Sequence, residues 1–211
     1  MVHSMTAFAR VEHNSSFGTL SWELRSVNHR YLEPHLRLPD TLREVEFDGA
    51  RVQLRGLRPG AENTVEIAGR ARYSRTGEGL HRFVDPADGL TYLYTQYEPT
   101  DARRVAAVFD QPDLKASYTF QVLAPAAWTV LNNTAAESIT DLSAEAAGTD
   151  PAHGTVRLHR FARTLPMSSY LTCVCAGPYA AVTGEHRVAG TGAVIPLGVH
   201  VRQSLAPYVD A

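Results

Sequence analysis

A carboxylate and an amide stand two residues apart in the segment TYLYTQYEPTDARR, residues 91–104. In an extended backbone, residues two apart face the same side, so Gln96 and Glu98 share one face while Tyr97 points to the other. Both side chains accept hydrogen bonds, and the glutamate also carries a negative charge. Together they can hold an ammonium group, so the segment predicts a binding site for an amine.

The elements that position this pair follow from its neighbours. Pro99 lacks a backbone N–H, so it should end the pairing of the strand. Asp101 stands where an N-cap residue would open a short helix over residues 102–109. A strand that stops just after two acceptor side chains is a common place for a ligand contact.

A structural role for the two acceptors is the alternative. Gln96 and Glu98 could satisfy backbone groups, or Glu98 could pair with Arg103 or Arg104. Exposed ion pairs of this kind contribute little, so the residue types alone do not decide between the two interpretations.

Alternating apolar and polar residues predict strands through most of the chain. Leu20, Trp22 and Leu24 alternate with polar residues, and an Asp48-Gly49 pair indicates a tight hairpin turn. Further strands are expected at residues 64–73, 117–122, 128–131, 155–161 and 170–176. The predicted fold class is mainly β: a saddle-like or sandwich antiparallel sheet domain with one short helix near residues 102–109.

Composition limits the function classes. Hydrophobic residues make up 44% of the 211 residues, which is enough for a core, and the formal net charge is −2. This balance offers no broad attraction to nucleic acid or to an anionic membrane. Charged residues interrupt every early apolar run, so we expect neither a signal peptide nor a membrane span, and a cytoplasmic location.

The two cysteines, Cys173 and Cys175, lie two apart in an expected strand. Their thiols should face one side, where a disulfide is constrained and two donors are too few for a closed zinc site. We expect two buried, reduced thiols.

Several unusual runs resemble one enzyme family. The runs RTGEGLHRFVDP from residue 75, TYLYTQYEPTDARR from residue 91 and FDQPDLK from residue 109 are similar to the aminopeptidase N family of zinc metallopeptidases. The resemblance covers about residues 41–211. It implies the family's N-terminal saddle-shaped β-domain, in which Gln96 and Glu98 would help to hold the free amino terminus of a peptide substrate.

The resemblance also implies zinc in the complete enzyme. That family holds its metal with a His-Glu-x-x-His helix motif, whose spacing puts both imidazoles on one helix face, and with a later Glu. Neither this motif nor any His-Glu dipeptide occurs in the 211 residues. We therefore expect no metal ligands and no independent catalysis here, in a domain that ends before the catalytic zinc domain.

The first residues resemble a different family. The runs SMTAFAR from residue 4 and GTLSWELRSVNHRYLEP from residue 18 are similar to the start of the YicC family of bacterial endoribonucleases, over about residues 2–39. We expect residues 1–40 to form a β-hairpin segment packed on the main sheet of residues 41–211. The chain is then a hybrid of two family beginnings.

Histidines could carry other chemistry. His29 beside Arg30 could act as a base near a phosphate, although a solvent-facing or hydrogen-bonded histidine is the simpler interpretation. His81 lies near the amine-binding strand in the aminopeptidase resemblance and should support it structurally. The remaining histidines show no ligand spacing.

Three functional hypotheses follow. The first is the amine-recognition and scaffold domain of an aminopeptidase N-like enzyme, with a peptide N-terminus as partner. The second is an RNA-processing protein related to the endoribonucleases. The third is a β-sheet interaction module that self-associates through an uncovered sheet face.

Overall fold

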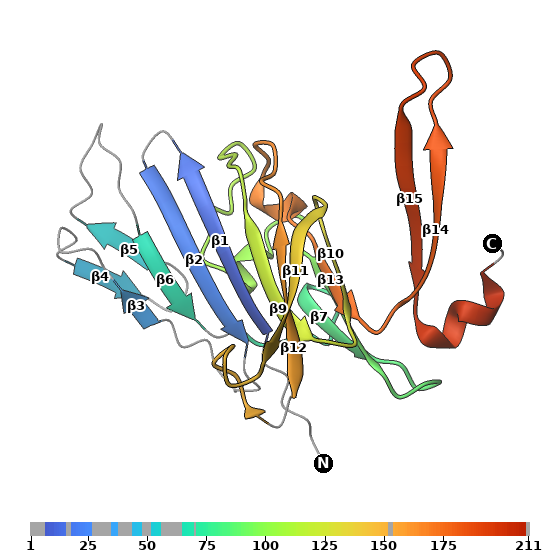
Figure 1. Cartoon of the computed structure of the whole chain (residues 1–211). Helices are drawn as coiled ribbons and strands as arrows, with labels where there is room; N and C mark the ends of the chain where they lie inside the picture. The colour runs from blue at the N-terminus through green and yellow to red at the C-terminus, as the bar shows by residue number, and fades with distance from the viewer. Residues whose placement is uncertain are drawn as a thin grey trace.

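The computed structural model describes residues 7–15, 18–26, 35–37, 44–47, 52–55, 65–69, 71–151 and 154–209 (Figure 1). Strands dominate these residues, and three short 3-10 helices accompany them. The prediction of a mainly β fold is confirmed. No helix in the described ranges is long and apolar enough to cross a membrane.

The largest sheet has seven strands in the order β11-β12-β9-β1-β2-β6-β3. Its neighbours are antiparallel except β2 and β6, which pair in parallel. The strands are Ala136–Ser143 (β11), Thr155–Phe161 (β12), Phe120–Pro125 (β9), Ala7–Ser15 (β1), Gly18–Ser26 (β2), Val65–Gly69 (β6) and His35–Arg37 (β3).

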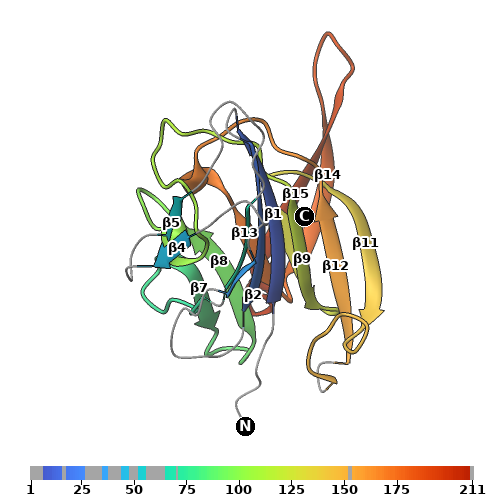
Figure 2. The same cartoon turned by 90° about the vertical axis from the view of Figure 1, so that its left-hand side faces the viewer.

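A second sheet has four strands in the order β10-β13-β8-β7, and it carries the candidate site. Figure 2 shows the two sheets as separate layers. The strands are Thr129–Asn132 (β10), Val174–Gly177 (β13), Thr91–Gln96 (β8) and Gly79–Val84 (β7).

The core lies between these two sheets. Phe120 and Val122 of β9 and Phe161 of β12 belong to one buried cluster with Leu93 of β8 and Ala176 of β13. Alternation explains this arrangement, because every second residue of each strand points to the same layer. Burying these side chains fixes which face of β8 remains outside.

The N-terminal hairpin pairs on both sides with strands from later in the chain. β1 pairs with β2 along nine residues and with β9 from Phe8↔Leu123 to Val11↔Phe120. β2 pairs with β6 from Leu20↔Val65 to Leu24↔Gly69. The hairpin therefore occupies a central position in the seven-stranded sheet, where the alternating pattern of residues 20–25 suits a paired strand.

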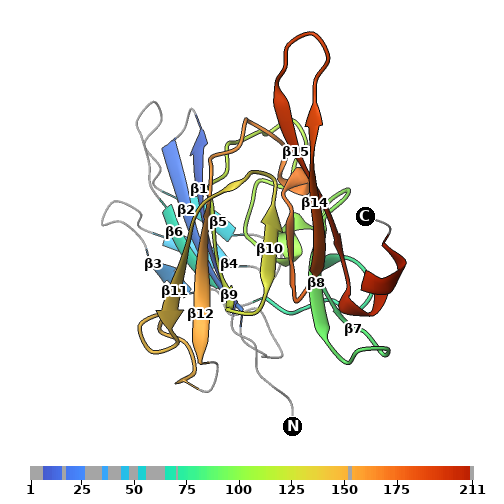
Figure 3. The same ribbon diagram turned by 45° about the vertical axis from the view of Figure 1, so that its right-hand side comes forward.

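Two hairpins stand apart from the large sheets. Glu44–Phe47 (β4) pairs with Val52–Arg55 (β5), so the predicted hairpin is present, while the Asp48-Gly49 turn lies outside the described residues. Ala180–Arg187 (β14) pairs with Val194–Val201 (β15) and projects from the main body (Figure 3). The chain then forms a 3-10 helix, Gln203–Tyr208 (η4).

The predicted helix at residues 102–109 is much shorter than expected. Only Ala102–Arg104 (η1) is helical, as a 3-10 turn, and Asp101 makes no side-chain cap hydrogen bond. The Asp101 carboxylate instead accepts a hydrogen bond from Arg104 Nε. Without that cap, and with β-branched valines after it, the segment does not propagate a helix.

Candidate functional site

Strand β8 presents Gln96 at its last position, and Glu98 follows just beyond it. Both side chains are exposed, while Tyr97 between them is only 8% exposed. The alternation therefore continues past the end of the ladder, and the two acceptors lie on the solvent side.

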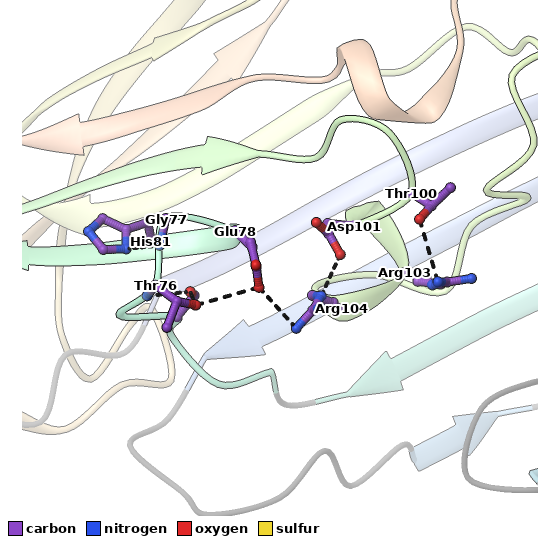
Figure 4. A network of polar contacts seen from close by, with 9 residues as sticks. Thr76, Gly77, Glu78, His81, Thr100, Asp101, Arg103 and Arg104 are labelled. Carbon is purple, nitrogen blue, oxygen red and sulfur yellow. Dashed lines mark hydrogen bonds and ion pairs between the residues drawn. The ribbon is translucent and has the colours of Figure 1, made fainter.

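Neither the Gln96 side chain nor the Glu98 side chain makes a hydrogen bond or ion pair with the described parts of the chain, because the nearby arginines bind elsewhere. Figure 4 shows Arg104 between two other carboxylates: its Nε contacts Asp101, and its Nη1 lies 3.4 Å from Glu78. Arg103 donates to the hydroxyl of Thr100 at 3.5 Å. The structural alternative, in which Glu98 pairs with these arginines, does not match this geometry.

The loop before β7 supports the end of β8. Gly79 is paired with Gln96 in the β7–β8 ladder, and Glu78 next to it holds Arg104. The backbone N–H of Gly77, at φ 94°, donates to His81 Nδ1 at 3.0 Å (Figure 4). This hydrogen bond fastens the loop to β7, and it matches the supporting position expected for His81.

Tyr97 points into the core, on the side of the strand opposite to Gln96 and Glu98. It packs with Ala102 and Val105 in a small buried cluster, and Tyr170 lies against that cluster. Burial raises the pKa of Tyr97 far above its ordinary value, with the charge of Cys173 acting in the same direction. The phenol therefore stays neutral, and its role is to fix the backbone that carries Gln96 and Glu98.

One of the two thiols, that of Cys175, lies on the same face as the acceptors. Cys175 is paired with Tyr94, whose side chain shares a face with Gln96, and the two Sγ atoms are 3.8 Å apart. Both cysteines are free, as expected of reduced thiols, but both are half-buried where burial was predicted. The strand begins only at Val174, which leaves Cys173 outside the regular ladder.

Zinc has no matching donor set in the described ranges. No group of three His, Cys, Asp or Glu side chains converges anywhere in the parts of the chain that are described. The cysteine pair supplies two donors only, whereas a protein zinc site needs at least three. The described residues therefore do not fit this metal.

The sequence did not predict one buried polar side chain, that of His159. His159 of β12 is 3% exposed, and neither ring nitrogen has a hydrogen-bond partner among the described residues. Its position in an alternating strand indicated burial on one face, but nothing in the pattern showed that the imidazole would lack partners. His29, the candidate base, lies outside the described residues.

A second cluster joins β7 and β8 to η4. Asp85 accepts hydrogen bonds from the Ser204 hydroxyl at 2.6 Å and the Ala87 N–H at 2.9 Å, and it pairs with Arg202 at 2.9 Å. The contacts of Asp85 with Ser204 and Arg202 span more than a hundred residues of sequence, so local patterns could not reveal them.

Two family models match the chain. The model of the peptidase M1 N-terminal domain matches residues 43–171, and the model of the endoribonuclease YicC-like N-terminal region matches residues 2–58. The second match runs further than the resemblance seen at residues 2–39 and overlaps the first match.

Individual relatives agree with both matches. Aminopeptidase N of Streptomyces lividans is 42% identical over 165 residues, which are 78% of this chain and 17% of that protein. Glutamyl aminopeptidase of Sus scrofa is 29% identical over 127 residues, 59% of this chain and 12% of that protein. The probable endoribonuclease YicC of Haemophilus influenzae is 54% identical over 46 residues, 22% of this chain and 16% of that protein.

The chain thus spans less than a fifth of the aminopeptidases that it matches. The peptidase match covers most of the described residues, including strands β7 and β8. On this match, the chain belongs to the peptidase M1 family through its N-terminal domain.

Proposed function

We propose that this chain is the amine-recognition and scaffold domain of an aminopeptidase N-like zinc metallopeptidase, which removes N-terminal residues from peptides. The observation that carries the proposal is the exposed Gln96 and Glu98 pair, held on a buried Tyr97. The family match supports peptides as the substrate class. In such an enzyme, zinc would be bound by residues other than those described here. We therefore propose that the chain alone has no catalytic role.

The chemistry of the pair suits a free amino terminus. A carboxylate and an amide carbonyl supply two acceptors for an ammonium group, and one of them adds charge. Since Arg103 and Arg104 are engaged by Thr100 and Asp101, the Glu98 carboxylate keeps its acceptor capacity. An exposed contact of this kind contributes about 0–1 kcal/mol, so the domain alone should bind amines weakly.

Amine binding is tested with the chain itself. We expect NMR signals of Gln96 and Glu98 to shift on titration with a dipeptide that has a free amino terminus, and not with its N-acetylated form. Glu98→Gln should abolish the shift because it removes the charge, and Glu137→Gln on exposed β11 is the matched control. Equal shifts with both dipeptides would refute amine recognition.

The absence of independent catalysis has its own test. The purified chain should release no arylamine from an aminoacyl-arylamide and should bind no stoichiometric zinc. The intact mass of the protein from its native source should be measured alongside this assay. A mass much larger than that of the 211 residues would mean that the native protein carries further residues. Hydrolysis by the chain of its own length, with one zinc per chain, would overturn this part of the proposal.

An RNA-processing role is the second candidate, and the match over residues 2–58 favours it. The net charge of −2 argues against tight RNA binding. Measurable RNA binding that weakens steeply as salt rises would support it. Unchanged electrophoretic mobility of RNA at low salt would exclude it.

We propose a cytoplasmic protein that does not act on membranes or nucleic acid, because its charge is nearly balanced. We also propose that the chain self-associates through the exposed hairpin β14–β15.

A further inference from the structure

The pair Cys173 and Cys175 has an arrangement that free cysteines need for reaction with each other. Their Sγ atoms are in van der Waals contact at 3.8 Å, both are free, and both are half-buried. The chain contains two cysteines in total, so neither has another intramolecular partner. Each thiol is therefore the other's only cysteine partner within the chain.

The backbone at Cys173 is held by side chains. Its N–H donates to Asn133 Oδ1 at 2.7 Å, and its carbonyl accepts from Asn132 Nδ2 at 2.7 Å. The next N–H, of Val174, donates to Thr95 Oγ1 at 2.9 Å. These contacts fix Cys173 just before the regular strand, so its thiol keeps a defined position beside Cys175.

The two thiols are not equivalent. A hydrogen bond from the Cys175 thiol lowers the pKa of Cys173 to about 6 against the effect of burial, and the Thr95 hydroxyl adds to the lowering. The same hydrogen bond and burial raise the pKa of Cys175. Near neutral pH, Cys173 is the thiolate and Cys175 holds the proton, which is the pattern of an attacking thiol beside a resolving thiol.

We propose that Cys173 and Cys175 form a thiol–disulfide exchange site for low-molecular-weight disulfides, in which Cys173 attacks and Cys175 resolves. The Cys173 thiolate attacks one sulfur of the external disulfide, whose S–S bond breaks and releases one thiolate. Cys175 gives its proton to that thiolate and attacks Cys173 Sγ, and the second external thiolate leaves. Two electrons pass from the pair to the external disulfide, which becomes one thiol and one thiolate, and the thiolate takes its proton from water.

The constrained spacing favours reversibility. A disulfide between residues two apart in an extended segment closes a small, strained ring. Strained and exposed disulfides have the higher reduction potentials of labile bonds. The product is therefore expected to be reduced again by ordinary thiols.

The site lies beside the amine-binding pair. Cys175 is opposite Tyr94, and the antiparallel direction of β13 places Cys173 towards Gln96. An adduct on Cys173 would therefore crowd Gln96. That consequence rests on the proposed function, whereas the exchange chemistry does not.

The test uses the intact reduced chain and glutathione disulfide as the probe. Acid-quenched mass spectra at pH 7 should show a transient adduct of one glutathione, followed by a chain that has lost two hydrogens. Cys175→Ser keeps a hydrogen-bond donor and should accumulate the adduct at Cys173. Cys173→Ser should react about tenfold more slowly, because burial still raises the pKa of the Cys175 thiol after the contact with Cys173 is lost.

A pH profile separates activation from simple exposure. Alkylation of Cys173 in Cys175→Ser should titrate near pH 6, and Cys175→Ala, which lacks the donor, should move the midpoint upward. Equal rates for the two serine variants, a disulfide-linked dimer in place of the internal bond, or reaction only in urea would each overturn the proposal. Because mass is the readout, its failure would leave amine recognition untouched.

Discussion

At the scale of single residues, His159 is the clearest conflict between a side chain and its surroundings. Its imidazole is 3% exposed, stacks near Phe161 at 6.3 Å between ring centroids, and has no hydrogen bond at either nitrogen. Burial lowers its pKa, and the charge of Arg157 lowers it further. The folded chain therefore holds this imidazole neutral.

Acidification should accordingly weaken the fold through His159. The pKa of this group is lower in the folded chain than its unfolded value of about 6.5, so the unfolded chain binds the proton more readily. The stability that the neutral imidazole gives the fold, relative to the protonated form, is fully present above pH 6.5. It is lost as pH falls through the lower, folded pKa. His159→Leu should flatten the dependence of the urea midpoint on pH below 6.5.

The same variant should also stabilise the chain at pH 7. Removing two buried nitrogens without partners recovers about 1–3 kcal/mol of desolvation free energy. His186→Gln on the exposed hairpin β14–β15 is the matched control and should change neither quantity. A destabilised His159→Leu at pH 7 would show that the imidazole makes a contact that the apolar side chain cannot replace.

At the scale of elements, the approach of β13 to β8 depends on a residue without a side chain. A Cβ placed on Gly177 would lie 2.8 Å from Tyr92 Cδ1 and 3.3 Å from the Thr91 carbonyl oxygen. Tyr92 is itself buried at 2% exposure, so its ring has little room to move. Gly177 therefore sets the distance between the strands that carry the thiols and the amine-binding pair.

Gly177→Ala should lower the free energy of unfolding by about 1–3 kcal/mol, the range for overpacking a filled core. Urea denaturation with a far-UV signal measures it. Gly184→Ala, where an added Cβ meets nothing within 4 Å, is the control and should leave the free energy almost unchanged. Equal stability of both variants would mean that Tyr92 can shift at low cost.

Asp85 joins elements that are distant in sequence. Its carboxylate is tied to Ser204 and Arg202, and the neighbouring Asp88 accepts the N–H of Ser204 at 3.2 Å. The hydrogen bond from Ser204 lowers the pKa of Asp85, followed by that from the Ala87 N–H. The stabilisation is therefore present above the unfolded value near 3.8 and lost as pH falls through the folded value.

Asp85→Asn should loosen η4 while the sheets remain paired. We expect faster hydrogen exchange at Ser204 and faster proteolysis within residues 203–208, because the charge-assisted contacts disappear. Asp113→Asn on an exposed loop is the control. The Tyr92 hydroxyl also accepts the N–H of Gln203 at 2.9 Å. Unchanged exchange at Ser204 would show that Asp88 and Tyr92 hold η4 without Asp85.

At the scale of the whole molecule, the hairpin β14–β15 exposes an apolar face. Ile195, Leu197 and Val199 alternate along β15, each 46–53% exposed, and Val182 of β14 lies opposite Val199. Contiguous exposed apolar side chains of this kind mark surfaces that another protein surface covers. In the isolated chain, a second copy is the available cover.

We therefore expect concentration-dependent self-association. Leu197→Lys should shift the mass from light scattering towards the monomer, because a lysine on that face costs burial of a charge. Thr183→Lys in β14 points to the opposite face of the hairpin and should leave association unchanged. A wild-type chain that stays monomeric at all concentrations would contradict this expectation.

The sequence determined the features that depend on local order. Alternation with a period of two is a property of neighbouring residues, so it predicted the β class and put Tyr97 on the face opposite to Gln96 and Glu98. The length of the helix at residues 102–109 was overestimated, because the Asp101 carboxylate accepts a hydrogen bond from Arg104 in place of a backbone N–H at the helix start. That competition depends on which side chains happen to be within reach.

Tertiary structure alone decided the rest, because those contacts join residues far apart in the chain. The parallel pairing of β2 with β6, the clasp of Asp85 on Ser204 and the missing partners of His159 leave no trace in a local pattern. The spacing of Cys173 and Cys175 predicted a shared face. Their contact at 3.8 Å and half-burial arise only when β13 packs beside β8, since neighbouring strands fix where a side chain can turn.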